Sequence, residues 1–172
     1  DVLDRNRRIL ICEEYGGIGD MLSFSAAVRA YKEQRGGHIT VRCKGGVDGP
    51  RAIILRRCEG VDDVTTVEVT QHKEDYDYIV NLGLAPAQGE MKEIPHVVSC
   101  RPESYCRALG IVVPIDLRAR IALLDSERQE AQELLRTHVV ISGEFILLAR
   151  KSSEPYKDWT DSYWNKLREL LE

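Results

Sequence analysis

The residues best suited to chemistry lie in a glycine-rich segment near the start of the chain. Positions 15–20 read YGGIGD and end in Asp20. Glycine lets the backbone turn sharply and lets a ligand approach the main chain closely. A carboxylate in such a place can take a proton from an incoming hydroxyl group. Asp20 is therefore the candidate general base of this sequence.

The elements on either side of this segment would position Asp20. An apolar run from Ile9 to Cys12 predicts a buried strand, and residues from Met21 to Arg35 favour a helix that Gly36 and the next glycine stop. Asp20 is then expected at the helix N-cap, at the carboxyl end of a strand, where open α/β sheets bind ligands. A purely capping role is the alternative interpretation, and one carboxylate can serve both roles.

Two familiar phosphate-binding motifs do not fit the segment. The P-loop requires Gly-Lys followed by Ser or Thr, whereas positions 19–21 read GDM. The dinucleotide fingerprint requires a third small residue where Leu22 stands, and an acid after the second strand where Lys44 stands. The sequence therefore argues against a plain ATP or NAD site.

The rest of the first two thirds of the chain alternates between strand and helix patterns. We expect a loop over 84–95, on the same side of the sheet as Asp20, and a kink or break at Pro102. Further strands are predicted over 38–43, 61–69 and 76–82, and further helices over 51–58 and 96–109. This alternation predicts an α/β fold, a Rossmann-like and mostly parallel sheet with flanking helices.

The pattern changes after about residue 112. We expect an extended connector over 112–124, a helix from a capping box at 126–129 to about 137, a strand over 145–149, and a final helix capped by Thr160. The last strand and helix look like the first unit of a second domain. The predicted divisions are a Rossmann-like domain over 1–112, a connector and helix over 113–142, and the start of a second domain over 143–172.

Composition narrows the class further. The formal net charge of −4 argues against general nucleic-acid binding. The sequence shows neither an apolar stretch long enough to span a membrane nor a secretory signal. The five cysteines include no CxxC pair and the four histidines lack ligand spacing, so we expect reduced thiols in a cytoplasmic protein without a metal or cofactor. Because the chain starts at Asp1, we expect a processed protein or a fragment.

Three segments in this order resemble the heptosyltransferase-like inverting glycosyltransferases, the ADP-heptose:lipopolysaccharide heptosyltransferases and their relatives. They read RRILICEEYGGIGDMLSFSAAVRAYK, YDYIVNL and FILLARKSSEPYKDWTDSYWNKLRELL. The resemblance implies a GT-B fold, in which two Rossmann-like domains face a cleft. The enzyme would transfer a sugar from a nucleotide-sugar donor to the hydroxyl of a glycan or other acceptor, without a metal ion.

The resemblance also implies roles for single residues. Asp20 would be the general base, Gly17, Ile18 and Gly19 would contact substrate beside it, and Lys157 would contact the donor phosphate. The family's later Asp-Thr/Ser-Gly-x-x-His stretch is absent from these 172 residues. We therefore expect a further domain or a partner chain to complete the donor site.

Other interpretations of the same residues stay open. The chain can be a non-catalytic Rossmann-like module that binds a ligand or a protein through the glycine segment, because this architecture hosts many functions. A nucleotide-dependent oxidoreductase is a third class, against which the incomplete fingerprint argues. Lys157 can be a solvated surface residue. The donor sugar, the acceptor and the oligomeric state are not specified by the sequence.

Overall fold

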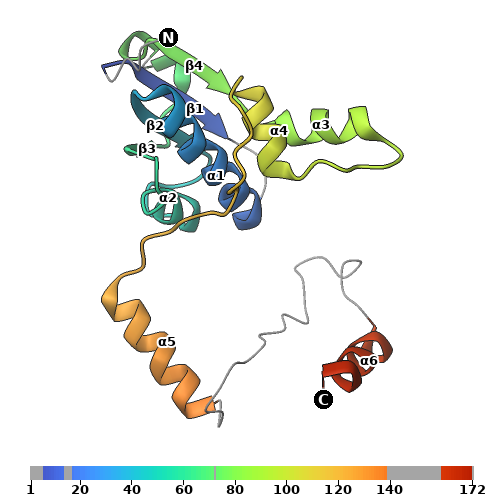
Figure 1. Cartoon of the computed structure of the whole chain (residues 1–172). Helices are drawn as coiled ribbons and strands as arrows, with labels where there is room; N and C mark the ends of the chain where they lie inside the picture. The colour runs from blue at the N-terminus through green and yellow to red at the C-terminus, as the bar shows by residue number, and fades with distance from the viewer. Residues whose placement is uncertain (1–5, 14–16, 72, 139–159, 172) are drawn as a thin grey trace. The chain divides into compact units, whose positions relative to one another are not determined.

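A computed structural model describes residues 6–13, 17–71, 73–138 and 160–171 (Figure 1). The chain divides into two units, Asp1–Leu124 and Asp125–Glu172, and each is described by itself. The first unit contains the β-sheet, and the second contains the helices α5 (Asp125–His138) and α6 (Asp161–Leu171). The divisions predicted at 112 and 142 remain predictions.

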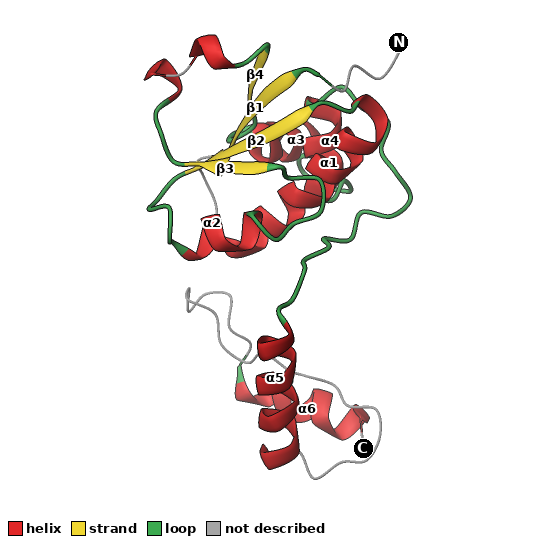
Figure 2. Ribbon diagram, turned by 90° about the vertical axis from the view of Figure 1, so that its left-hand side faces the viewer, coloured by secondary structure: helices red, strands yellow, loops and turns green. Residues whose placement is uncertain are grey.

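The first unit is built on a four-stranded parallel sheet (Figure 2). Its strands are β1 (Arg8–Glu13), β2 (His38–Cys43), β3 (Asp63–Thr65) and β4 (Tyr78–Asn81), in the order β3-β2-β1-β4. In the middle of the sheet, Cys12 of β1 pairs with Arg42 on one side and Asn81 on the other. The carboxyl ends of these strands therefore share one edge. The predicted Rossmann-like α/β fold is confirmed.

Helices cover the sheet and enclose one hydrophobic core. They are α1 (Ile18–Arg35), α2 (Pro50–Leu55), α3 (Ala85–Glu93) and α4 (Arg101–Ala108). Because side chains alternate along a strand, Ile9, Ile11 and Glu13 share one face of β1. Ile9 and Ile11 are buried in one cluster with Phe24 of α1 and Tyr105 of α4. The rings of Phe24 and Tyr105 meet edge to face at 5.5 Å, which joins α1 to α4 beside the sheet.

The segment predicted as a loop over 84–95 is mostly helix, so that prediction was wrong. Pro86 lies in the first turn of α3, where its missing N–H costs no hydrogen bond. Gly89 lies so close to α4 that an added Cβ would be 2.6 Å from the hydroxyl oxygen of Ser104. Helix α4 likewise begins at Arg101 instead of residue 96, and Pro102 lies in its first turn and does not kink it.

The third strand is much shorter than the predicted range of 61–69. It covers Asp63–Thr65 and is followed by a 3₁₀ turn at Val69–Gln71. The buried guanidinium of Arg42 explains the early end, because its Nε donates to the carbonyl of Val67 at 2.8 Å and its Nη2 lies 2.7 Å from Glu68. These contacts fix the chain outside the sheet. The predicted helix over 51–58 also ends early, at Leu55.

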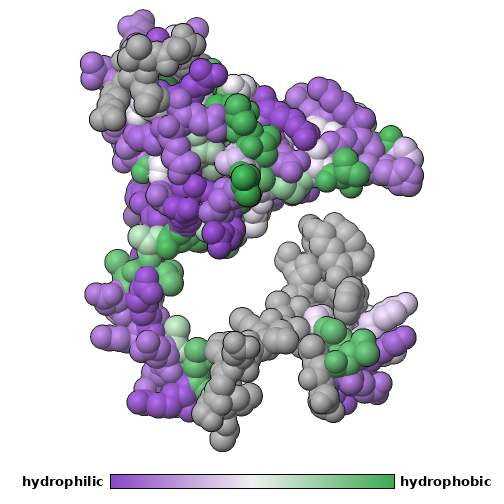
Figure 3. All heavy atoms as spheres, in the orientation of Figure 1, coloured by the Kyte–Doolittle hydropathy of each residue, from purple (hydrophilic) through white to green (hydrophobic). Residues whose placement is uncertain are grey.

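The connector after α4 is extended, as predicted, and is attached to the first unit. Buried Arg29 of α1 donates to the carbonyl of Asp116 at 2.8 Å. The side-chain amide of Gln34 bonds both the N–H and the carbonyl of Val112. Hydrophobic side chains gather over this connector on the face shown in Figure 3, and Ile115 within it is fully exposed.

In the second unit, both predicted helices are present. Helix α5 begins one residue before the predicted capping box, and α6 begins directly after Thr160. Trp164 and Leu167 are half-buried, which agrees with the predicted apolar face of α6. The predicted strand over 145–149 lies outside the described residues. In the described ranges, no helix has both the length and the apolar content required to cross a bilayer.

Candidate functional site

The glycine segment delivers Asp20 to the first turn of α1, and not to its N-cap as predicted. The N-cap is Gly17, whose extended backbone leads into the helix, and Asp20 is the third helical residue. From there its Oδ2 accepts a hydrogen bond from the N–H of Gly17 at 2.8 Å. This is the backward half of a capping box, in which an acid at the third position satisfies an N–H that the helix leaves unpaired.

The other carboxylate oxygen of Asp20 contacts a residue far away in the sequence. Oδ1 accepts a hydrogen bond from Nη1 of Arg101, the first residue of α4. Nε of Arg101 donates to Oε1 of Glu90 on α3 at 2.9 Å. We call Asp20, Arg101 and Glu90 the Arg101 cluster. It joins three helices in front of the carboxyl edge of the sheet.

Arg101 occupies a place that does not favour a cation. The N-terminus of a helix carries partial positive charge, and a cation there costs roughly 0.3–1 kcal/mol. Its two acidic partners offset this cost. The hydrogen bond to Glu90 raises the pKa of Arg101, and the bond to Asp20 raises it further, against an opposing effect of burial. Arg101 is half exposed, whereas the Asp20 side chain keeps 19% of its surface accessible.

A second acid lies just before the glycine segment. Glu13 ends β1 and is almost fully buried, and its Oε1 accepts a hydrogen bond from the hydroxyl of Tyr105 at 3.4 Å. Burial raises the pKa of Tyr105 well above its ordinary value, and the nearby charges of Glu13 and Asp20 raise it further. Tyr105 stands four residues after Arg101, so both project from one face of α4. That face therefore contacts an acid on each side of the glycine segment.

The surroundings of Asp20 leave room for a reacting group. A carboxylate offers about four acceptor positions, and the two contacts above occupy two of them. Apart from chain neighbours and the backbone of α1, no described atom lies within 4 Å of a Cβ built on Gly17 or Gly19, and Ile18 is exposed. The start of α1 is thus an open surface beside a partly accessible carboxylate. The predicted substrate contacts of Gly17, Ile18 and Gly19 remain predictions, and Lys157 lies outside the described residues.

Sequence reasoning found Asp20 and missed Glu13, Glu90, Arg101 and Tyr105. The four-residue spacing of Arg101 and Tyr105 places them on one helix face, but only once α4 is known to begin at Arg101. An arginine directly before a proline that starts a helix was the one available signal. Nothing local indicates that its partners are Asp20 and Glu90.

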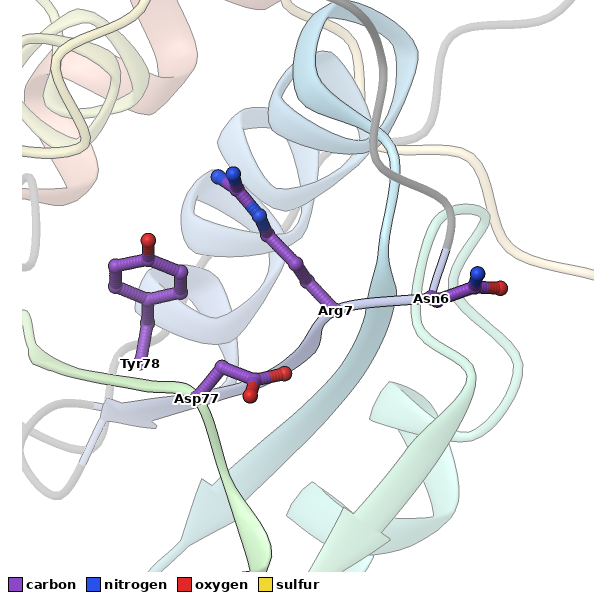
Figure 4. Close-up of a pocket in the computed structure, with 4 residues that line it drawn as sticks. All are labelled: Asn6, Arg7, Asp77 and Tyr78. Atoms are coloured by element: carbon purple, nitrogen blue, oxygen red, sulfur yellow. The ribbon is translucent and has the colours of Figure 1, made fainter.

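Two further hollows lie among the described residues, one far from the Arg101 cluster and one beside it. One, of about 430 Å³, is lined by Asn6, Arg7, Asp77 and Tyr78 (Figure 4). It lies where β1 and β4 begin, at the edge of the sheet opposite to Asp20. The Arg7 guanidinium lies 5.4 Å from the centre of the Tyr78 ring there. The other, of about 520 Å³, lies between the start of α4 and the connector, from Cys100 to Arg118.

Metal-binding side chains are not grouped in the part of the chain that the structure describes. There, no three His, Cys, Asp or Glu residues come together in a way that would hold a metal ion. The arrangement around Asp20 consists instead of two carboxylates joined by one guanidinium, together with helix-terminal N–H groups. Such groups suit proton transfer and the binding of polar ligands.

Fold and site together define the class as a Rossmann-like α/β domain with an acid at the carboxyl edge of its sheet, the edge at which open α/β sheets bind ligands. A glycosyl transferase family 9 protein from Veillonella parvula DSM 2008 has a similar crystal structure, with a TM-score of 0.67. The two sequences are 12% identical, and the similarity covers 96% of this chain but 60% of the other. No protein-family model and no curated protein matches the chain. At this identity the similarity shows the fold alone.

Proposed function

We propose that this chain is part of an inverting glycosyltransferase that uses a nucleotide-sugar donor, with Asp20 as its general base. The observation that carries the proposal is the position of Asp20, a partly accessible carboxylate in the first turn after the central strand of a parallel sheet. Ligands bind at that edge in open α/β sheets. The similarity in fold to a family 9 glycosyl transferase supports the same class.

The proposed reaction needs little more than this carboxylate on the acceptor side. Asp20 takes the proton of the acceptor hydroxyl as its oxygen attacks the anomeric carbon of the donor sugar. The bond from that carbon to the diphosphate breaks on the opposite face, so the configuration inverts and the nucleoside diphosphate leaves with the electron pair. Lys157 and N–H groups at a helix terminus would stabilise the departing phosphate, which makes a metal ion unnecessary.

The donor side of the site is proposed to come from outside the first unit. The chain spans 60% of the length of the glycosyl transferase that it resembles in fold. A further domain or a partner chain would then supply the remaining donor contacts, and closure over the substrates would exclude water.

The test starts with donor binding by the complete native protein. A panel of nucleotide sugars should include one that raises the melting temperature, because a ligand that binds only the native state stabilises it. With that donor, Asp20→Asn should lower the rate of transfer by roughly 10²- to 10⁴-fold while donor binding stays intact. Normal transfer by Asp20→Asn would exclude Asp20 as the base.

One observation favours a second function, a non-catalytic binding module. Both oxygens of Asp20 already accept hydrogen bonds, one from Gly17 and one from Arg101, as in a residue that only stabilises a helix start. Under this alternative the native protein binds a ligand at the same edge but turns over no nucleotide sugar. Product analysis with the stabilising donor and a mixture of glycan acceptors separates the two functions.

A further inference from the structure

The face of α4 that carries Arg101 and Tyr105 contacts the last residue of β1 and the acid that ends the glycine segment. Tyr105 donates to Glu13, the last residue of β1, and Arg101 donates to Asp20 in the first turn of α1. Tyr105 is almost fully buried against Phe24 of α1, so this face of α4 has a fixed position relative to α1. Arg101, one turn earlier on the same face, is thereby aimed at Asp20.

We propose that Arg101 is the positioning residue of the proposed base, and that Glu90 positions Arg101 in turn. This inference rests on the proposed function of Asp20. A single hydrogen bond would let a carboxylate rotate about its last bond. With Oδ2 bound by the N–H of Gly17 and Oδ1 by Arg101, the plane of the Asp20 carboxylate is fixed, and its remaining acceptor positions point in defined directions. Small misplacements of a reacting group cost large factors in rate.

The geometry of the guanidinium is suited to this role. Arg101 uses two different nitrogens for two acids, Nη1 for Asp20 and Nε for Glu90, and a planar group fixes the angle between them. A lysine at the same place has one charged atom and sets no such angle. Glu90 comes from α3, which Gly89 allows to pack closely on α4. The orientation of Asp20 thus depends on the packing of α3 and α4.

Helix α4 also contains a matched control. Arg107 is half exposed like Arg101 and also contacts two acids, Glu93 at 3.5 Å and Glu103 at 3.4 Å. Among the contacts of the described residues, neither Glu93 nor Glu103 reaches Asp20, and Arg107 lies near the other end of the helix. Removing Arg107 takes away a similar set of surface ion pairs, which contribute little by themselves, and also its hydrogen bond to the Ser99 hydroxyl at 2.6 Å.

The experiment is a kinetic double-mutant cycle on the complete native protein, with the nucleotide sugar found in the donor screen. Arg101→Ala should lower kcat by roughly 10- to 100-fold at an unchanged KM for the donor, whereas Arg107→Ala should keep the native kcat. Because Arg101 acts through Asp20, Arg101→Ala should add nothing in an Asp20→Asn background. Guanidinium ions, far below unfolding concentrations, should partly restore kcat to Arg101→Ala and not to Arg107→Ala.

The outcomes separate the inference from the proposed function. If Asp20→Asn abolishes transfer while Arg101→Ala keeps the native kcat, the inference is overturned and the function stands. If Arg101→Ala lowered kcat by the same factor in the native and in the Asp20→Asn background, the inference would be overturned as well. Should Arg101→Ala fail to fold, Arg101→Lys and Glu90→Gln decide instead, with intermediate losses of kcat expected from both. If the native protein transfers sugar from none of the donors, the proposed function and the positioning role of Arg101 are overturned together.

Discussion

Asp20 and Arg101 stand 81 positions apart in the sequence, and their side chains form an ion pair in the folded protein. The contact joins the first turn of α1 to the first turn of α4. Each residue has a second partner, the N–H of Gly17 for Asp20 and Glu90 for Arg101. The proposed base is therefore held directly from α1 and α4 and, through Arg101, from α3, so the packing of these helices bears on its orientation.

The close approach of α3 to α4 makes Gly89 sensitive to substitution. In Gly89→Ala, the new Cβ would lie 2.6 Å from the Oγ and 3.2 Å from the Cβ of Ser104. Alanine favours helix, but overpacking of this kind costs about 1–3 kcal/mol, so we expect a net loss in the free energy of unfolding. Urea unfolding measures the loss. The double variant Gly89→Ala with Ser104→Gly should recover part of it, and an unchanged single variant would contradict the close packing.

Alanine substitutions at Gly60 and Gly110 distinguish the cost of backbone strain from the cost of a steric clash. Both have positive φ, +91° and +64°, where a side chain costs roughly 1–2 kcal/mol. A Cβ on Gly60 would lie 2.6 Å from the Cα of Arg29, whereas a Cβ on Gly110 would have no described atom within 4 Å beyond its chain neighbours. Gly60→Ala should therefore lower the free energy of unfolding by at least ~2 kcal/mol more than Gly110→Ala does. Equal losses in the free energy of unfolding for the two variants would show that α1 shifts at Arg29 to make room for the new Cβ.

Glu93 gives stability a pH dependence. Hydrogen bonds from the Ser99 hydroxyl, and from the N–H groups of Ser99 and Val98, lower its pKa to about 2 from an ordinary value of 4.5. A pKa lowered by folding means that the contribution is complete above the ordinary value and is lost as the pH falls toward 2. We expect Glu93→Gln to be less stable than the native chain at neutral pH. The difference in melting temperature should shrink between pH 4.5 and 2.

Glu59 supplies the control for this measurement. Its carboxylate is exposed and contacts Arg120 at 3.1 Å. Glu59→Gln removes one acid from the same unit without affecting the segment at Ser99. The melting temperature of Glu59→Gln should differ little from that of the native chain at every pH, since exposed ion pairs contribute little to stability. If the difference in melting temperature between Glu93→Gln and the native chain did not vary with pH, the lowered pKa of Glu93 would be contradicted.

The five thiols should react at two very different rates. Cys100 is exposed, while the other four are buried. Burial raises the pKa of Cys43 and Cys58, and raises that of Cys106 to about 11, so few of these thiols are in the reactive thiolate form at neutral pH. Native protein treated with iodoacetamide should add one label rapidly, and mass spectrometry should place it at Cys100. Cys100→Ser should remove the rapid phase, and rapid labelling at Cys106 would show that the core opens.

Local patterns were enough to predict much of the fold. The first strand, the helix after the glycine segment, the strand at His38–Cys43 and the helices α5 and α6 were all expected within a few residues of their observed bounds. Each is defined by neighbours in the sequence, such as an apolar run, a glycine stop or a capping residue. The buried thiols of Cys12 and Cys43 followed from the same patterns.

Other features depended on partners that no local pattern names. Helix α3 was taken for a loop because its packing depends on the absence of a side chain at Gly89 opposite Ser104. The strand at Asp63–Thr65 stops early because buried Arg42 holds the carbonyl of Val67. Asp20 was placed at the N-cap, but the extended backbone of Gly17 starts the helix three residues sooner.

The sequence by itself determined that an acid follows a glycine segment between a buried strand and a helix, because both elements form from contacts between near neighbours. Only the tertiary structure decided what that acid touches. Arg101, itself bound by Glu90, reaches Asp20 because parallel strands bring their following segments to one edge of the sheet, and because Tyr105 anchors α4 against α1. Contacts over such separations depend on the packing of whole elements, which residue spacing does not encode.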